Sequence, residues 1–330
     1  MTADLRCAVI GAGYFGRNYI RLLQEMPDVL LSAVASRSNP PAKKNISDLP
    51  SQVRYCTDAR EVFSDATIDC VVIATPASSH ATLATAALEQ GKHVLVEKPM
   101  AMSVQEAERI TEAARKSGRI FMVGHQYLYN DYVRELKRMI DGGVLGGARY
   151  VIAERMSFGP IRSDVGCFWE TAGHDLAIIE YLFSPGTVKK SHTILSDLAG
   201  SGRDDFASAG IVFESGLVAA MAVSWFAPEK TRRMTITGDK GMAVFDEMRP
   251  EQLRIFRHPY PAPADRSGGQ SVFPKMDGEE MVTPVINARE PLRSQLEHFI
   301  ACIRTGEEPV TGIEHGLRVT TAMESISHGA

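Results

Sequence analysis

The segment LRCAVIGAGYFG, residues 5–16, decides how the first part of the chain folds. Its first six residues form an apolar run typical of a buried parallel strand. Gly11, Gly13 and Gly16 follow in a G-x-G-x-x-G pattern that opens a helix. The first glycine permits a tight turn, the second lets a pyrophosphate approach the main chain, and the third lets the helix pack closely on the strand. We therefore predict a dinucleotide-binding turn here. A glycine-rich turn without a ligand is the alternative.

Strands and helices alternate through the first 126 residues. Further strands are predicted at 29–35, 70–76, 93–98 and 119–125. The helix predicted over 103–118 opens with a capping box, Ser103 with Glu106, and closes at Gly118. Alternation with short connections predicts a parallel sheet with right-handed crossovers, which is an α/β Rossmann domain over residues 1–126.

The sequence pattern changes after about residue 145. Long strand-like runs follow, and turn signals at 214–216 and 238–241 indicate hairpins. We expect an antiparallel sheet and hence a second, α+β domain over residues 127–330. Residues 259–290 are rich in proline, glycine and charge and predict a surface excursion. Amphipathic helices are expected from Pro291 onward, packing back on the first domain.

Composition excludes several classes of protein. The chain has 330 residues, 36 basic and 40 acidic, for a net charge of −4, which gives no electrostatic basis for binding nucleic acid or an anionic membrane. No apolar run approaches the roughly 20 residues that span a bilayer, and no leader-like segment precedes the first strand, so we expect a cytoplasmic protein.

The five cysteines include no C-x-x-C pair, so neither a disulfide framework nor a zinc site is predicted. Cys7 and Cys70 are expected to act as small hydrophobic residues.

The end of the second strand predicts which nicotinamide cofactor binds. A carboxylate there usually holds the ribose hydroxyls, but this strand ends in Ser36, Arg37 and Ser38. A hydroxyl beside a guanidinium would hold a 2′-phosphate through charge-assisted hydrogen bonds. We therefore favour NADP(H), with NAD(H) also possible. The alternative is that Arg37 stacks on the adenine and discriminates little.

The strand over 93–98 ends with Glu97, Lys98 and then Pro99. Parallel strands deliver their carboxyl ends to the ligand crevice, so Lys98 should lie near the nicotinamide and donate to a substrate oxygen. X–Pro bonds are almost the only ones that adopt the cis form, which makes Lys98–Pro99 a candidate. Glu97 could pair with Lys98 or bind ribose hydroxyls. The alternative is a salt-bridged pair with no part in chemistry.

The segment FWETAGHDLAIIEYLF, residues 168–183, predicts a helix from about Gly173, with a turn before it. Glu170 and His174 are four residues apart, which on a helix puts a carboxylate and an imidazole on one face. His174 beside Asp175 could titrate near neutral pH. An ordinary helix-start histidine is the alternative. No third ligand stands at a supporting spacing, so no metal is predicted.

Taken together, these motifs resemble the glucose–fructose oxidoreductase / inositol dehydrogenase family, Gfo/Idh/MocA. The resemblance covers nearly the whole chain and is carried by these segments: AVIGAGYFGRN at 8–18, VVIATPASSHATLATAALEQGKHVLVEKPMA at 71–101, ETAGHDLAII at 170–179, and the tail from Glu290. It implies a Rossmann domain and a C-terminal domain with a large open, mostly antiparallel sheet that often forms the oligomer interface. It also implies oxidation of a secondary alcohol of a sugar or cyclitol, or reduction of the matching ketone.

The resemblance further implies roles for single residues. Lys98 matches the lysine that contacts the reacting oxygen, and His174 matches the general acid/base. Glu170 stands where the family usually has aspartate, and residues 124–130, GHQYLYN, depart from the more common asparagine–arginine form. The segment RMSFGPIRSDVGCFWETAGHDLAI, residues 155–178, is most similar to members that act on nucleotide-linked amino sugars.

These interpretations define the predicted site. The predicted cofactor contacts are Gly11, Gly13, Tyr14, Phe15, Gly16, Ser36, Arg37, Ser38, Thr75, Pro76, His80, Glu97, Lys98 and Gln126. The predicted substrate contacts, chosen by position, are Lys98, Tyr127, Tyr129, Arg155, Arg162, Asp164, Glu170 and His174. Lys98, His174 and Glu170 are the predicted catalytic residues. The expected protein is an NAD(P)-dependent oxidoreductase for a carbohydrate, a homodimer or homotetramer through its C-terminal sheet. The alternatives are a sugar-sensing regulator, an NAD-assisted glycosidase and an oxidoreductase for non-sugar substrates.

Overall fold

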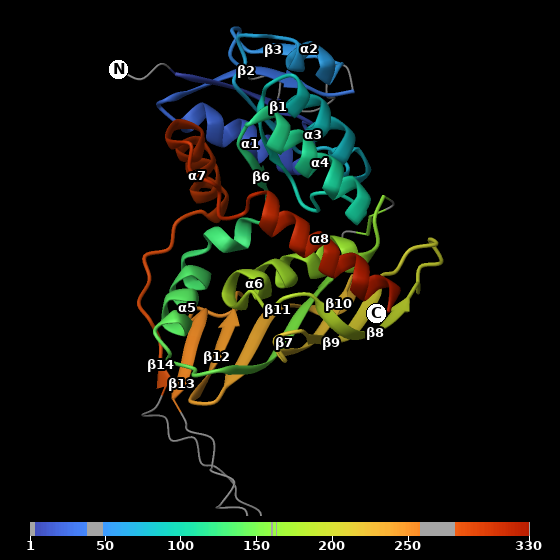
Figure 1. Ribbon diagram of the computed structural model, residues 1–330, viewed down its shortest axis with the longest axis vertical. Helices are drawn as coiled ribbons and strands as arrows, with labels where there is room; N and C mark the ends of the chain where they lie inside the picture. Colours follow the sequence, from blue (N-terminus) through green and yellow to red (C-terminus); the bar gives the residue numbers. More distant parts are fainter. Residues whose placement is uncertain (1–3, 38–48, 160, 163, 258–280, 330) are drawn as a thin grey trace, which may run out of the picture. The chain divides into compact units, whose positions relative to one another are not determined.

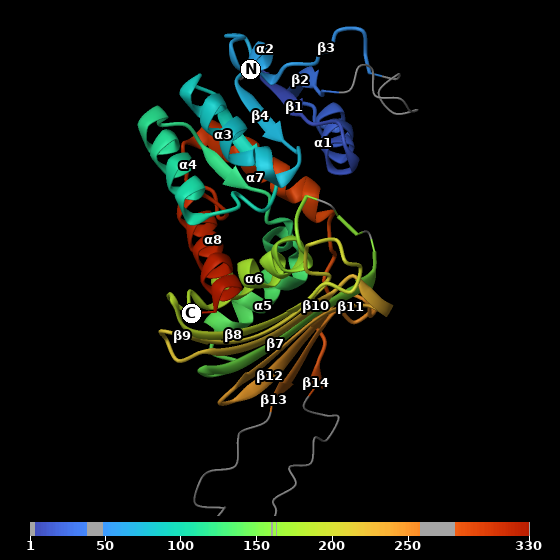
Figure 2. The ribbon, with the colours of Figure 1, turned by 90° about the vertical axis from the view of Figure 1, so that its right-hand side faces the viewer.

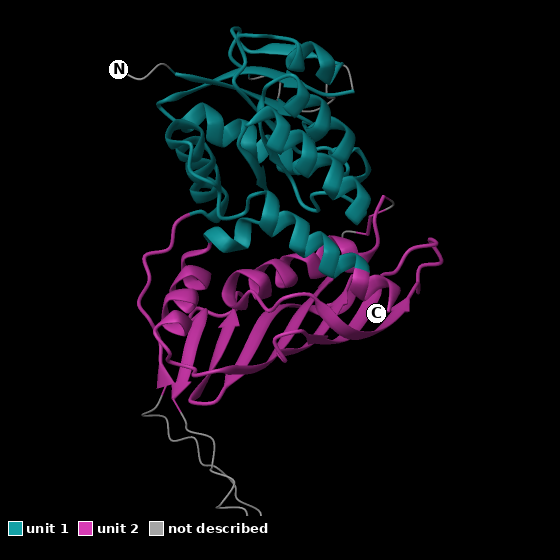
Figure 3. Cartoon of the chain, in the orientation of Figure 1, with its two compact units in different colours: residues 1–129, 290–324 teal, residues 130–289, 325–330 magenta. Residues whose placement is uncertain are grey.

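The structure is a computed structural model that describes residues 4–37, 49–159, 161–162, 164–257 and 281–329. The chain forms two compact units (Figure 3). The first contains residues 1–129 and 290–324, and the second contains residues 130–289 and 325–330. Among the described residues, no helix combines the length and the apolar character that a bilayer crossing requires.

A parallel six-stranded sheet, in the order β3-β2-β1-β4-β5-β6, forms the centre of the first unit (Figure 1). Its strands are β1 Leu5–Ile10, β2 Val29–Ala35, β3 Arg54–Cys56, β4 Cys70–Ile73, β5 His93–Val96 and β6 Phe121–Val123. The prediction of a parallel Rossmann sheet is confirmed, and β3 is a strand that the sequence pattern did not predict. The strand order reverses between β1 and β4, and ligands of such sheets bind where the order reverses.

The helices between these strands are α1 Tyr14–Glu25, α2 Ala59–Phe63, η1 Ala77–Ser79, α3 His80–Glu89 and α4 Val104–Ser117. After the last strand come η2 Gln126–Tyr129 and, at the end of the chain, α7 Pro291–Thr305 and α8 Ile313–His328, of which residues 325–328 belong to the second unit. The predicted cap is present, because the Ser103 side chain accepts a hydrogen bond from the Glu106 amide. Gly118 ends α4 in the left-handed conformation, with φ of 64°. Apolar residues of β1, β4 and β5 pack with those of α3 and α4 in one core.

Cys7 and Cys70 lie opposite each other in the register of β1 and β4. They pair as a disulfide, with their Cα atoms 4.9 Å apart. The prediction that no disulfide occurs and that both residues act only as small hydrophobic side chains is therefore wrong. Sequence spacing could not show this pair, because the sheet brings together two residues separated by 63 positions.

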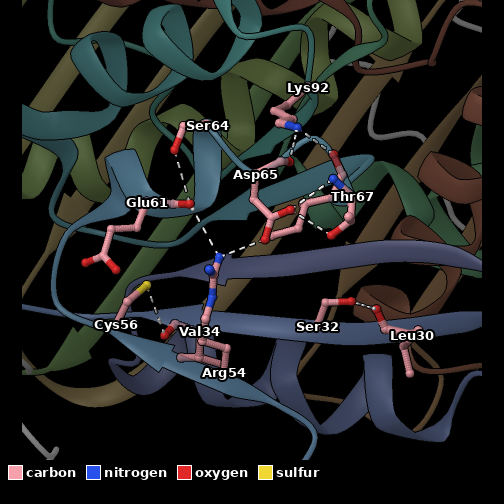
Figure 4. Close-up of polar contacts among 11 residues, drawn as sticks. Leu30, Ser32, Val34, Arg54, Cys56, Glu61, Ser64, Asp65, Thr67 and Lys92 are labelled. Atoms are coloured by element: carbon pink, nitrogen blue, oxygen red, sulfur yellow. Dashed lines mark hydrogen bonds and ion pairs between the residues drawn. The ribbon is translucent and has the colours of Figure 1, made fainter.

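A polar cluster at the amino-terminal end of β5 fixes the connection between α2 and β4 (Figure 4). Lys92, which immediately precedes β5, is buried, and its ammonium donates to the carbonyl oxygens of Asp65 at 2.6 Å and Ile68 at 2.7 Å. Arg54 donates to the Asp65 carboxylate at 3.0 Å. Burial lowers the pKa of Lys92, and nearby Asp65 opposes that shift. The cluster lies at the end of the strand remote from the carboxyl ends where ligands bind.

An eight-stranded sheet dominates the second unit, in the order β14-β13-β12-β11-β7-β10-β9-β8. Its strands are β7 Ala148–Phe158, β8 Val188–Ser196, β9 Phe206–Phe213, β10 Val218–Ser224, β11 Phe226–Gly238, β12 Gly241–Asp246, β13 Leu253–Arg257 and β14 Met281–Val282. All neighbours pair antiparallel except β10 with β7. The predicted large, mostly antiparallel sheet is confirmed, as are the hairpin turns between β9 and β10 and between β11 and β12. Most of the predicted excursion over 259–290 lies outside the described residues.

Helices α5 Asp131–Asp141 and α6 Gly173–Phe183 lie on one face of this sheet, and a π-helical turn, η3 Phe168–Ala172, leads into α6 (Figure 2). Along β7 the burial alternates. Val151 and Ala153 point to the helices and are buried, whereas Tyr150 and Ile152 point to the opposite face and are exposed. The second unit therefore has one covered and one open face of its sheet.

Candidate functional site

The glycine turn after β1 has the form that a pyrophosphate requires. Gly11 has φ of +97°, and a Cβ there would lie 2.6 Å from the Ala74 carbonyl oxygen, so only glycine fits. A Cβ on Gly16 would clash with the Gly11 carbonyl. At Gly13, by contrast, no described atom lies within 4 Å of the Cβ position, and no side chain caps the start of α1. The open space and the uncapped amide groups fit a bound phosphate.

The end of β2 carries no carboxylate. The Ser36 amide donates to the Cys56 carbonyl at 3.0 Å, and the Tyr55 hydroxyl donates to the Ser36 carbonyl at 3.2 Å. These bonds use the main chain of Ser36, and the next side chain, Arg37, is exposed. Ser38, the third predicted contact here, lies outside the described residues. A guanidinium rather than an acid therefore follows the strand that borders the ribose site in this fold.

The connection after β4 is held by short hydrogen bonds. Ser79 Oγ lies 2.7 Å from both Thr75 Oγ1 and the Pro76 carbonyl oxygen. The Thr75 methyl lies next to Gly11, 3.0 Å from that residue's Cβ position. His80, the first residue of α3, is buried, and its ring lies against two main-chain carbonyls. Thr75 therefore lies beside the glycine turn, and the roles of Thr75 and Pro76 as cofactor contacts stay predictions.

Glu97, at the carboxyl end of β5, is the centre of a buried network. Its Oε1 accepts a hydrogen bond from the Tyr19 hydroxyl at 2.7 Å, and its Oε2 accepts one from the Lys98 amide at 3.1 Å. Gln295, on α7, donates to the Tyr19 hydroxyl at 2.8 Å. Burial and the Glu97 charge raise the pKa of Tyr19 well above its usual value. Glu97 therefore holds the Lys98 main chain, and α1 and α7 in turn hold Glu97.

Lys98 is 8% exposed, and its bond to Pro99 is cis, as the sequence indicated. Its positive charge acts on the ring of His125, which follows β6. Burial, His315 and Lys98 all lower the pKa of His125. The imidazole of His125 therefore stays neutral beside the ammonium. The sequence did not single out His125.

Three predicted residues lie just beyond β6, in η2. Gln126 is half-buried and Tyr127 is buried. Tyr129 is fully buried, and its hydroxyl lies 3.2 Å from Thr311 Oγ1. Tyr129 is thus a core residue of the first unit, because α7 and the Thr311 segment cover it, a placement that the sequence could not show.

In the second unit, two buried side chains join β7 to α6. Arg155 and Asp175 form a bidentate ion pair, with contacts of 2.7 and 3.2 Å. Both are almost completely buried. Such a pair fixes geometry because removal of either partner would leave a buried charge uncompensated. Asp175 follows His174 directly, so the pair fixes the main chain that carries His174.

A second ionic cluster surrounds the π-helical turn. Arg162 forms two bonds to Asp164, at 2.8 and 2.9 Å, and its third nitrogen lies 3.3 Å from Glu170. All three side chains are half-buried, and the side chain of Arg162 is 33% exposed. His174 lies in the first turn of α6 and is also half-buried. The structure thus brings together Arg162, Asp164 and Glu170. Arg155, which was predicted to contact the substrate, is instead paired with Asp175.

The predicted residues thus form two groups. The first unit gathers the glycine turn, Thr75, Pro76, Glu97 and Lys98 at the carboxyl ends of β1, β4 and β5. The second gathers Arg162, Asp164, Glu170 and His174 around η3 and α6. Tyr19, Gln295 and Asp175 support these groups and were not predicted to. Their signal was weak, because a tyrosine on α1 and a glutamine on α7 are ordinary helix residues until the fold places them next to Glu97.

Residues 5–125 match the oxidoreductase family with an NAD-binding Rossmann fold, and residues 133–244 match the GFO/IDH/MocA C-terminal domain. The chain belongs to the Gfo/Idh/MocA oxidoreductase family. The predicted family is therefore confirmed, and the chain is a nicotinamide-dependent oxidoreductase with an NAD-binding Rossmann domain.

Relatives of this Gfo/Idh/MocA protein include two named dehydrogenases. Scyllo-inositol 2-dehydrogenase (NAD(+)) of Bacillus subtilis is 26% identical over 321 residues, 94% of this chain and 89% of the relative. UDP-N-acetylglucosamine 3-dehydrogenase of Acidithiobacillus ferrooxidans is 25% identical over 300 residues, 91% of this chain and 88% of the relative. A solved structure of the latter has a TM-score of 0.83 at 22% identity and covers 99% of this chain and 98% of its own. An oxidoreductase structure from Magnetospirillum magnetotacticum has a TM-score of 0.82 at 28% identity, covering 98% and 99%.

Proposed function

We propose that this oxidoreductase interconverts a secondary alcohol and a ketone of a sugar, nucleotide sugar or cyclitol by hydride transfer. The observation that carries the proposal is the position of Lys98. It lies at the carboxyl end of β5, on a main chain held by Glu97, in the unit that contains the phosphate turn. Relatives that share most of the chain's length act on inositol and on UDP-N-acetylglucosamine, as their names state.

In this proposal, Lys98 and His174 act on the same substrate oxygen. A dinucleotide whose pyrophosphate binds at the glycine turn would supply the hydride acceptor or donor through its nicotinamide. During oxidation His174 removes the hydroxyl proton, while Lys98 donates a hydrogen bond to that oxygen and stabilises the developing negative charge. During reduction the proton returns from His174. The two residues belong to different units, and their meeting over one cofactor is part of the proposal.

The ionic cluster of the second unit supports a polar, hydroxyl-rich substrate. Asp164 and Glu170 supply carboxylate oxygens that accept hydrogen bonds from hydroxyl groups, and the partly exposed guanidinium of Arg162 can donate to carboxylate or phosphate oxygens. A nucleotide-linked amino sugar carries both kinds of group. We therefore place nucleotide sugars first among the substrate classes.

The test is a substrate panel assayed by absorbance of the reduced nicotinamide. Purified protein is supplied with NADP⁺ or NAD⁺ and with UDP-N-acetylglucosamine, UDP-glucose, scyllo-inositol, myo-inositol and free hexoses. Turnover with one of the nucleotide sugars, and a primary isotope effect when the reacting carbon carries deuterium, would support the proposal. If no sugar or cyclitol supports reduction of either coenzyme, the proposed reaction is wrong.

We further propose NADP(H) as the preferred cofactor, with NAD(H) as the alternative. The support is Arg37, exposed at the end of β2 next to Ser36 where a carboxylate would repel a 2′-phosphate. A hydrogen bond to a charged group contributes about 1.5–3 kcal/mol, so Arg37→Ala should weaken NADPH binding by about 10- to 100-fold while NADH binding changes little. Fluorescence titration with both coenzymes measures this. Equal weakening of both would mean that Arg37 stacks on the adenine.

One relative supports a second candidate function without net cofactor turnover. The 2,7-anhydro-N-acetylneuraminate hydratase of Mediterraneibacter gnavus is 29% identical over 184 residues, 53% of this chain and 48% of the relative. That name states a hydratase, which is a reaction without net oxidation. An NAD-assisted glycosidase would oxidise and then re-reduce its sugar, so cofactor would co-purify and absorbance would not change during turnover. A non-catalytic regulator would bind the sugar and leave it unchanged. Mass spectrometry of the sugar after incubation separates all three outcomes.

The open face of the second unit's sheet supports assembly as a homodimer or homotetramer. Tyr150 and Ile152 on β7 and Val218 on β10 are exposed, and Val218 pairs with Tyr150 in the register. Contiguous exposed apolar side chains of this kind mark interaction surfaces. Ile152→Glu should shift the protein toward monomer in light scattering after size exclusion. Leu198→Glu, at an exposed position outside the strands, is the matched control. A wild-type monomer would refute the proposal.

A further inference from the structure

The ring of His80 bridges two connections at the ligand side of the parallel sheet. Its Nδ1 lies 2.7 Å from the Pro99 carbonyl oxygen, and its Nε2 lies 2.9 Å from the Thr75 carbonyl oxygen. Thr75 follows β4 and Pro99 follows β5, and these two strands are direct neighbours. One side chain, 1% exposed, therefore ties together the segments that leave adjacent strands.

The chemistry of these two contacts bears on the proton count of the ring. A carbonyl oxygen only accepts hydrogen bonds, so both contacts are hydrogen bonds only when each ring nitrogen donates, and a neutral imidazole has a single N–H. A neutral His80 would set a nitrogen lone pair against one carbonyl oxygen. The doubly protonated ring satisfies both contacts. Burial disfavours this charge, whereas charge-assisted hydrogen bonds and two carbonyl dipoles directed at the ring favour it.

Two charged residues belong to the segments that this ring contacts. Glu97 and Lys98 directly precede Pro99, one negative and one positive. On the other side, Thr75, Pro76 and Ser79 do not ionise. The Pro99 and Thr75 carbonyl oxygens are the acceptors that the two ring nitrogens meet, and both belong to segments that carry predicted ligand contacts.

We propose that His80 is a positioning residue, a doubly donating imidazolium that fixes the spacing between the Thr75 segment and the Lys98–Pro99 segment. The Thr75 methyl lies 3.0 Å from the Cβ position of Gly11, so neighbouring groups lead from the glycine turn through Thr75 and His80 to Pro99. His80 thereby sets where Lys98 stands relative to a dinucleotide in the turn. The catalytic consequence rests on the proposed function of Lys98, whereas the protonation state does not.

The first experiment measures the ring itself. The full chain, with its nine histidines labelled with ¹⁵N, is studied by two-bond ¹H–¹⁵N NMR at pH 7, and His80→Gln assigns the signal. Two protonated nitrogens on His80 are expected. One protonated and one bare nitrogen would overturn the double-donor assignment. This result does not depend on any substrate and holds whether or not the proposed reaction is correct.

The second experiment measures positioning. His80→Phe removes both N–H groups, and His80→Gln keeps an amide that can reach one carbonyl. Small misplacements of catalytic groups cost up to about 10²-fold in rate, so we expect kcat on the active sugar to fall by about 10- to 100-fold in His80→Phe and less in His80→Gln. The NADPH dissociation constant should change by a smaller factor than kcat, because the glycine turn that binds the pyrophosphate is intact.

His93→Gln is the matched control. His93 begins β5, and its Nδ1 accepts a hydrogen bond from the Ile120 amide at 3.0 Å at the opposite end of the strand. Its kcat should equal that of the wild type. Wild-type kcat in His80→Gln and in folded His80→Phe would overturn the positioning role. A wild type inactive on every sugar would instead contradict the proposed function, and the NMR result would still decide the protonation of His80.

Discussion

A buried lysine flanks strand β5 on each side, Lys92 before it and Lys98 after it, and the two lysines differ in what surrounds the ammonium group. Lys92, at the amino-terminal end, is 4% exposed and gives its ammonium to two main-chain carbonyls of the preceding loop. Lys98, at the carboxyl end, is 8% exposed and lies among Glu97, the cis proline and the neutral ring of His125. Burial is therefore nearly the same at both ends, and only the neighbours distinguish a structural lysine from a candidate catalytic one.

The difference follows from the direction of the sheet. In a parallel sheet all carboxyl ends meet at the edge where ligands bind, and all amino ends meet at the opposite edge. A lysine at the amino end can therefore contribute only to stability. A lysine at the carboxyl end can serve chemistry, provided that its main chain is held by other groups. The Glu97 carboxylate performs this task by accepting from the Lys98 amide.

Lys98→Met is the strongest test of this contrast. It removes the charge at nearly constant side-chain length, and we expect the turnover number to fall by about 10²-fold or more, as for the loss of a positioned acid–base or oxyanion group. NADPH affinity should remain close to that of the wild type. Steady-state kinetics on the active sugar and fluorescence titration measure the two quantities. Normal turnover in this variant would remove Lys98 from the mechanism.

Lys92→Met should show the opposite pattern. The Asp65 carbonyl keeps its bond from the Ile68 amide, so the loss falls mainly on the Ile68 carbonyl. A buried acceptor left without a donor costs about 1–3 kcal/mol, which should appear in the free energy of unfolding by urea. The turnover number should not change. Lys116→Met, on the exposed surface of α4, is the control and should alter stability by less than about 0.5 kcal/mol. Loss of turnover in Lys92→Met with unchanged stability would contradict the assignment of Lys92 as a structural lysine.

Much of the fold could be predicted because it rests on local patterns. Apolar runs, the glycine turn and the Ser103 cap are each contained within a few residues, and the structure confirms them. The strand Arg54–Cys56 and the helix Ala59–Phe63 were missed because three and five residues are too few to show a period. The Cys7–Cys70 pair was missed because it depends on which strands become neighbours.

The candidate site divides in the same way. Lys98 stands in a short motif at a strand end and could be predicted from its sequence position. The ion pairs of the second unit could not, because Arg155 meets Asp175 only after β7 and α6 have packed together, and Arg162 reaches Glu170 only through the π-helical turn. The sequence therefore predicts the site residues whose positions follow from the course of the main chain. It does not predict the residues whose positions depend on which side chains pair after the elements have packed.

Tyr19→Phe probes the support beneath Lys98 and should have the smallest effect. It removes a hydroxyl that donates to Glu97 and accepts from Gln295, so two buried polar groups each lose a partner. Glu97 still accepts from the Lys98 amide, which limits the loss in unfolding free energy to about 1–2 kcal/mol. Turnover should fall severalfold, since Lys98 loses part of its anchoring. Tyr14→Phe, at an exposed position of the same helix, should leave stability unchanged. A stability loss without any change in turnover would show that the bond between Tyr19 and Glu97 stabilises the fold but does not help to position the ammonium of Lys98.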